Sequence, residues 1–180
     1  MGTLKKVKWV LDPSHSEILF KVKYLMITNV KGEFRKFEGE INTVGNEFSA
    51  AAVNVTIDAS SIFTNEANRD THLKSAEFFD VENHKVLKFE GTSLIKKDDK
   101  NYELKGNLTI KGVSREVKLD VEFGGINKDP WGNEKAGFSL EGKINRKEWG
   151  LNWNAALETG GVLVSDEVKL SAEVQFVKQL

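Results

Sequence analysis

The sequence contains no cysteine, which excludes disulfide bonds, thiolate zinc sites and cysteine nucleophiles together. It also lacks any stretch approaching the ~18 consecutive apolar residues that a membrane span requires. Neither sign of charge dominates, because 26 Lys and Arg face 27 Asp and Glu, for a formal net charge of -1. Such a balance provides no long-range field to attract nucleic acid or an anionic bilayer, so no partner of either kind is predicted.

What remains is the composition of an ordinary globular domain. Hydrophobic residues make up 39% of the chain and charged residues 29%, which is neither disordered nor fibrous. Without an internal repeat, low-complexity tract or linker, residues 1–180 are predicted to form a single domain. The first residues carry lysines but no apolar core of a signal peptide. This predicts a cytoplasmic protein, or a periplasmic one if a signal has been removed.

Apolar residues recur with period two along most of the chain, which is typical of β-strands with one buried face. The clearest stripes are Tyr102, Leu104, Leu108 and Ile110, and then Val117, Leu119, Val121 and Phe123. Hairpins are predicted around Gly112 and between Lys96 and Asn101. Eight to ten such strands cannot leave their apolar faces uncovered, so the fold is all-β and antiparallel, either a closed barrel or a two-layer sandwich, and a barrel is favoured.

Three segments depart from this alternation. Residues 64–75 are polar and predict a short helix with Thr64 or Asn65 as its N-cap. Residues 145–154 predict a helical turn or an irregular crossing, and both segments are expected near the barrel ends. Between Phe34 and Phe37 the phase of the alternation changes, which suggests a bulge.

The apolar face carries a very small residue partway along five strands: Gly39, Gly91, Gly106, Gly142 and Ala172. These residues either leave a void inside the barrel or mark bends of the strands, and the sequence leaves both alternatives open. If they leave a void, Gly106→Leu should obstruct it while the protein still folds. A void along a barrel would suit a linear apolar molecule, which gains ~0.8 kcal/mol for each buried CH₂ group.

Several ordered motifs resemble YceI-like proteins over nearly the whole chain. They are Asp12-Pro13-Ser14-His15-Ser16, the segment from Ser61 through Arg69-Asp70 and His72-Leu73-Lys74-Ser75 to Phe78-Phe79-Asp80, Gly106 to Val113, Asn145-Arg146, and Val164 to Val168. The resemblance implies an eight-stranded lipocalin-like barrel that binds polyisoprenoid or a related long-chain lipid, often as a dimer. Two positions differ from the family pattern, since Tyr24 replaces a usual His and Lys85 a frequent Pro.

Strand parity predicts which side chains would line a lipid-binding bore. The predicted walls are Phe20, Val22, Tyr24, Phe34, Phe37, Phe89, Leu104, Leu108, Phe123, Phe138 and Leu140, closed by Phe78, Phe79 and Trp149. Candidates for contact with a lipid head group are His15, His72 and Arg146. His15 and Arg146 have structural alternatives, a turn contact and a partner carboxylate respectively, and His72 would be the general base of an enzyme, for which Asp70 is poorly placed.

The sequence therefore predicts a protein that carries one long amphiphilic lipid, a polyisoprenoid or an isoprenoid quinone, without chemical turnover. No cofactor, metal site or catalytic residue is predicted, because the three His lack ligand spacing and no nucleophile motif occurs. The expected partners are the lipid and a second copy of the chain, with no nucleic acid and no membrane span. Two alternatives remain: a hydrolase or isomerase that uses His72 and Tyr24 at the barrel mouth, and a packed interaction barrel without a ligand.

Overall fold

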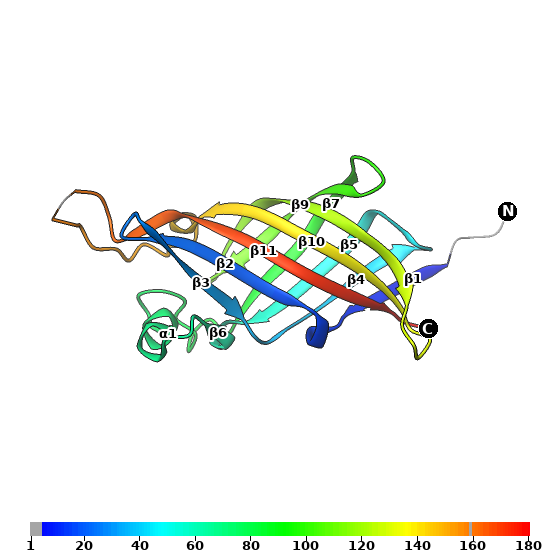
Figure 1. The fold of residues 1–180 in the computed structure, drawn as a ribbon, viewed down its shortest axis with the longest axis horizontal. Helices are drawn as coiled ribbons and strands as arrows, with labels where there is room; N and C mark the ends of the chain where they lie inside the picture. Colours follow the sequence, from blue (N-terminus) through cyan, green and yellow to red (C-terminus); the bar gives the residue numbers. More distant parts are fainter. Residues whose placement is uncertain (1–4, 159) are drawn as a thin grey trace.

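A computed structural model describes residues 5–158 and 160–180. It is an elongated β-barrel with the start of β1 and the C-terminus near one end and the helix α1 at the other (Figure 1). The strands are β1 (Lys6–Leu11), β2 (Glu17–Tyr24), β3 (Thr28–Phe34), β4 (Phe37–Val44), β5 (Glu47–Asp58), β6 (Ile62–Phe63), β7 (Val86–Lys96), β8 (Asn101–Ile110), β9 (Val113–Lys128), β10 (Glu134–Asn145) and β11 (Val164–Lys178). The helices are α1 (Ala67–Lys74) and the 3₁₀ turns η1 (Pro13–His15), η2 (Ala59–Ser61) and η3 (Arg146–Trp149).

The barrel closes because one edge of β11 pairs with two successive strands. The end of β11 pairs with β1, and its earlier part, from Val164 to Glu173, pairs with β2. β1 and β2 thus form one barrel strand interrupted by η1, and β4 and β3 form its equally interrupted neighbour. Together with β5, β7, β8, β9, β10 and β11, these two composite strands make the predicted eight-stranded antiparallel barrel.

The predicted turns are present, and one irregularity differs from its prediction. Lys111 and Gly112 connect β8 to β9 in a two-residue hairpin turn, with φ values of 54° and 77°. The phase change after Phe34 is a break between β3 and β4 and not a bulge within one strand, because Arg35 bonds to Ser61 while Asp58 bonds to Lys36. These bonds attach the chain around η2 to the break.

Residues 59–85 cover the barrel wall beside β3, whose edge opposite β2 pairs with the short strand β6 at Glu33 and Phe34. Within this segment α1 begins at Ala67, and its N-cap is Glu66, whose carboxylate accepts from the backbone N–H groups of Asn68 and Arg69. The expected caps Thr64 and Asn65 are therefore wrong, because Thr64 instead donates its backbone N–H to Asp70 (2.9 Å). Among the described residues, no helix is both long enough and apolar enough to cross a bilayer.

Aromatic side chains fill the barrel end nearest the termini. Phe48 is 1% exposed and lies with its ring centroid 5.3 Å from Trp9, 5.3 Å from Phe123 and 5.2 Å from Phe138. Phe176 packs edge-on against Phe138. This end of the barrel is therefore solid.

The glycines on the apolar face do not by themselves create a void. A Cβ atom on Gly106 would lie 2.5 Å from the backbone oxygen of Glu90 and 2.5 Å from the ring of Phe89. The Leu119 side chain likewise occupies the space over Gly142. The Gly106→Leu prediction therefore loses its premise, because a side chain at this position would collide with the neighbouring strand β7 and would not enter a void.

Candidate functional site: a two-chambered hollow

The barrel interior contains two hollows lined almost entirely by apolar side chains. The larger, which we call the mouth chamber, has a volume of about 460 Å³ and lies beneath α1. The smaller, the inner chamber, has a volume of about 160 Å³ and lies towards the aromatic end. Ile18, Ile57, Leu108 and Leu170 line both chambers, so only side chains separate them.

The mouth chamber is built where the wall is not a regular sheet. Strands β2, β3 and β11 provide one side, with Phe20 and Val168 facing inward. The helical segment provides Leu73 and Phe79, and the irregular chain after η3 provides Trp153. Its lining also includes the exposed residues Lys23 and Asn68, which place the mouth of the bore at this end.

Arg69 and His72, two polar side chains that reach the mouth chamber, are bonded to protein atoms. Arg69 donates to the hydroxyl of Thr64 (2.8 Å) and to its backbone oxygen (2.7 Å). The His72 Nε2 lies 2.6 Å from the Glu77 carboxylate, and its ring stands edge-on to Trp153 at 4.7 Å. These contacts hold the rim of the chamber in one arrangement.

Arg146 is 3% exposed and holds together the chain that follows β10. Its guanidinium donates to the backbone oxygens of Ser165 (2.9 Å), Leu151 (2.5 Å), Trp153 (2.9 Å) and Val164 (3.3 Å). Burial lowers its pKa from the ordinary value, and the nearby charge of Asp166 opposes that shift. With four of its N–H groups bonded to carbonyls, Arg146 has little capacity left for a head group.

The structure distributes the sequence-predicted wall residues over both chambers. The mouth chamber is lined by Phe20, Val22, Tyr24, Phe34, Phe78, Phe79 and Leu108, together with the head-group candidates His72 and Arg146. The inner chamber is lined by Phe89, Leu104, Leu108, Phe138 and Leu140, and also by Ala172.

Four predicted site residues lie outside the lining of both chambers. Phe123 belongs to the aromatic end, and Phe37 is buried in the core beside the break between β3 and β4. Trp149 is 1% exposed and donates its indole N–H to the Leu108 backbone oxygen (2.8 Å), so it fills the wall. His15 lies in η1, 2.9 Å from Asp12, which agrees with its structural alternative.

Other lining residues were not among the predicted walls. Val168 and Leu170 belong to an alternating stripe of β11, so strand parity could have identified them. Leu73, Trp153 and Leu163 come from irregular segments, and no periodicity in the sequence assigns their direction.

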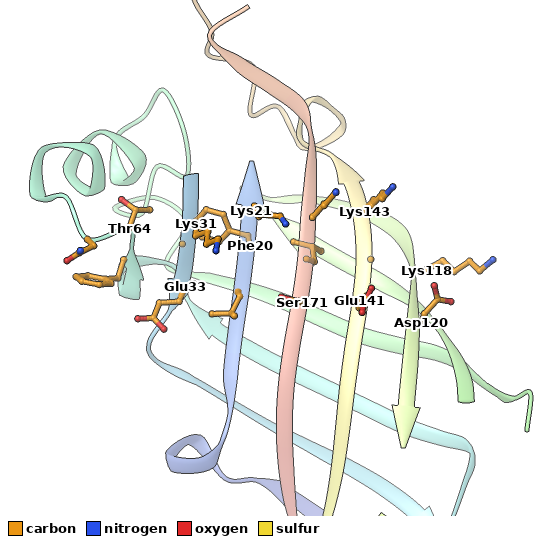
Figure 2. Close-up of a pocket in the computed structure, with 17 residues that line it drawn as sticks. Phe20, Lys21, Lys31, Glu33, Thr64, Lys118, Asp120, Glu141, Lys143 and Ser171 are labelled. Carbon is orange, nitrogen blue, oxygen red and sulfur yellow. The ribbon is translucent and has the colours of Figure 1, made fainter. Parts of the chain in front are cut away.

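A further hollow of about 930 Å³ lies on the outer face of the barrel (Figure 2). It is lined by charged side chains, among them Lys21, Lys143 and Glu141, that alternate along their strands with the inward residues. It is therefore a depression of the outer wall, and it shares Phe20, Thr64 and Leu170 with the lining of the mouth chamber.

Comparisons with known proteins agree with this geometry. A family model described as the YceI-like domain matches residues 9–176. A UPF0312 protein from Staphylococcus epidermidis is 39% identical over 170 residues, which is 94% of this chain and 96% of that protein. A UPF0312 protein from Staphylococcus aureus is 39% identical over 169 residues, covering 93% of this chain and 96% of that protein.

Solved structures resemble the barrel closely. The crystal structure of the Campylobacter jejuni YCEI protein has a TM-score of 0.75 at 34% identity and covers 88% of this chain and 90% of that one. A polyisoprenoid binding domain from Saccharophagus degradans has a TM-score of 0.67 at 15% identity, covering 95% of this chain and 98% of that one. At that identity the second likeness concerns the fold alone.

Proposed function

Since the chain belongs to the YceI-like family, we propose that it binds one long apolar lipid chain in the two-chambered hollow and carries it without chemical change. The observation that carries this proposal is the hollow itself, a mouth chamber of about 460 Å³ continued by an inner chamber of about 160 Å³. The mouth chamber falls within the roughly 300–1,000 Å³ typical of small-molecule sites.

The shape of the hollow favours a linear guest. The chambers lie one behind the other along the barrel and share Leu108 and Leu170, so a chain that enters the mouth chamber must pass these side chains to go deeper. The aromatic end blocks exit on the far side. A polyprenyl chain or the tail of an isoprenoid quinone fits a blind, apolar bore, and the polyisoprenoid binding domain from Saccharophagus degradans shares this fold.

Two observations support carriage over catalysis. The predicted enzyme alternative assigns chemistry to His72 and Tyr24, yet within the described chain no hydrogen bond joins these two residues, and the His72 ring stands edge-on to Phe78 and Trp153. The Arg69 and Arg146 guanidinium groups bond backbone oxygens. The side chains at this rim are therefore bonded to the protein and are not placed to react with a head group, which is consistent with binding of a lipid without chemical change.

The experiment is to compare the mass of the gently ionised intact protein with its organic extract, in the wild type and in Ala172→Leu. Ala172 lines the inner chamber, and a leucine there would fill much of its roughly 160 Å³. We expect a bound mass of several hundred daltons in the wild type. We expect Ala172→Leu to retain less of it, with a shift towards shorter chains.

Ala52→Leu is the matched control, because Ala52 is exposed on β5 and the same atoms are added outside the barrel. Its lipid content should equal that of the wild type. Wild-type protein that carries no lipid, even after incubation with polyprenols and quinones, would refute the carrier. Turnover of a lipid that disappears in His72→Ala would favour the enzyme alternative instead.

A further inference from the structure

The turn between β2 and β3 exposes large apolar side chains beside the mouth. Leu25 is 38% exposed, Met26 58% and Ile27 77%. The Leu25 N–H donates to the backbone oxygen of Leu163 (2.8 Å), a residue that lines the mouth chamber. Val162, 40% exposed, lies next to Leu163. We call Leu25, Met26, Ile27 and Val162 the apolar tip.

The residues of this turn are not those that would stabilise it. Leu25 and Met26 have φ values of 54° and 63°, a left-handed conformation that tight hairpin turns ordinarily assign to Asn and Gly. Two large apolar residues there add backbone strain to the cost of exposing hydrocarbon to water. Strain and exposure at one turn indicate that its side chains serve a contact outside the barrel.

A row of four lysines crosses the outer wall near the tip. Lys143 pairs with Lys169, Lys169 with Lys21, and Lys21 with Lys31, on four neighbouring strands. Figure 2 shows Lys21, Lys31 and Lys143 on the outer wall. We call these four residues the lysine row.

The charges of this row are largely uncompensated. Within the described chain, Lys21, Lys31 and Lys169 have no carboxylate within 4.0 Å, and Lys143 reaches Glu167 only at 3.8 Å, with both side chains exposed. Three carboxylates also line this depression: Glu33, which bonds to Arg35 (2.8 Å), and Asp120 and Glu141, neither of which lies within 4.0 Å of a lysine of the row. Like charges directly opposite each other destabilise a sheet, so the row gains most from an anionic surface outside the protein.

We propose that the apolar tip and the lysine row together dock the mouth of the barrel onto a bilayer that contains anionic phospholipid. This inference rests on the proposed function, because docking would place the mouth chamber where a lipid chain can enter or leave it. The net charge of -1 hides this local surface, since it averages the lysine row with acidic residues elsewhere on the barrel.

The spacing of the two features suits a bilayer surface. Leu25 lies four positions after Lys21 along the chain, which is roughly 13 Å of strand and less along the tilted barrel axis. Apolar groups of peripheral proteins enter roughly 5–10 Å into the headgroup and acyl boundary. With the tip at that depth, extended lysine side chains reach the phosphate groups, each of which accepts a charge-assisted hydrogen bond.

The test is flotation of the full-length protein with vesicles of phosphatidylcholine, alone or with about 30% phosphatidylglycerol, an anionic lipid that attracts basic patches. We expect at least roughly tenfold stronger binding to the anionic vesicles, lost in about 0.5 M salt because screening removes the attraction. Met26→Ser with Ile27→Ser, and separately Lys21→Gln with Lys169→Gln, should each weaken binding by about tenfold.

Matched controls lie on other faces. Val44→Ser with Ile95→Ser removes similarly exposed apolar surface from β4 and β7, and Lys6→Gln with Lys88→Gln removes two exposed charges from β1 and β7. Both controls should bind as the wild type does. Equal binding to both kinds of vesicle, or equal losses in the controls, overturns the proposal. The proposal is also overturned if neither protein binds vesicles and the wild type is a dimer while the tip variant is a monomer, because the tip would then be a dimer contact.

Bound lipid, measured on the same samples by intact mass, separates this inference from the proposed function. The tip and the lysine row lie outside the bore, so these variants should keep their lipid. Protein that floats with anionic vesicles but never carries lipid would count against the carrier and for the docking surface. Protein that carries lipid but ignores vesicles would count against docking alone.

Discussion

At the scale of single residues, Asp12 shows how one carboxylate fixes the junction between β1 and β2. It accepts from the Ser14 N–H (3.1 Å) and hydroxyl (2.7 Å) and contacts His15 (2.9 Å) and Lys135 (3.3 Å). The Ser14 hydrogen bond, followed by those of His15 and Lys135, holds the pKa of Asp12 well below its ordinary value of 3.8, although burial opposes the shift. A depressed pKa in the folded state stabilises the protein above pH ~3.9, and this contribution is lost as the pH falls further. Asp12→Asn should therefore lower the free energy of unfolding by about 1 kcal/mol at pH 7 and by less at pH 3, as measured by urea unfolding. Asp99→Asn, in the exposed turn before β8, is the control, and a pH-independent loss in Asp12→Asn would contradict the assignment.

At the scale of elements, the irregular chain between η3 and β11 depends on one arginine. Arg146 donates to four backbone oxygens, and among them Leu151 and Val164 lie at the two ends of that chain. Lysine keeps the charge but cannot supply the planar fork of donors, so Arg146→Lys leaves buried oxygens without partners. We expect a loss of about 2–3 kcal/mol in unfolding free energy and at least roughly tenfold faster amide exchange over residues 151–164, with the amides of β7 and β8 less affected. Arg115→Lys provides the control, because Arg115 is exposed and makes a single 3.3 Å bond to Glu148. A uniform change in exchange across the barrel would show that Arg146 supports the whole fold and not this segment.

At the scale of the whole molecule, the barrel is hollow at one end and solid at the other. The solid end is centred on Phe48, which three aromatic rings surround within 5.3 Å. Phe48→Ala would leave a cavity that the closed sheet cannot collapse to fill, at a cost of about 3–5 kcal/mol. For a chain of this size we expect the Tm to fall by roughly 10 °C in a thermal unfolding experiment. Trp131→Ala is the control, since Trp131 is 82% exposed in the β9–β10 turn and its removal should change the Tm little. Comparable losses in both variants would contradict a packed end around Phe48.

The sequence by itself determined the class of fold and much of the inner face. Alternation with period two is a local property, so it identified the strands and the inward positions of residues such as Phe20, Leu104 and Phe138. Hairpin turns such as Lys111-Gly112 are equally local. The very small residues did not predict the position of the void. Whether a glycine leaves empty space depends on the side chains of the neighbouring strand, and the Phe89 ring occupies the space over Gly106.

Only the tertiary structure decided where along the bore the hollow lies and what surrounds its mouth. Parity gives the direction of a side chain but not its height in the barrel, so Phe123 was predicted as a wall and lies in the solid end. The register between strands that are distant in the sequence decided the charged surface near the mouth, because it brings four lysines into one row: Lys21, Lys31, Lys143 and Lys169. The net charge and the local sequence pattern do not say which residues lie side by side on different strands. The register of the closed sheet fixes those neighbours.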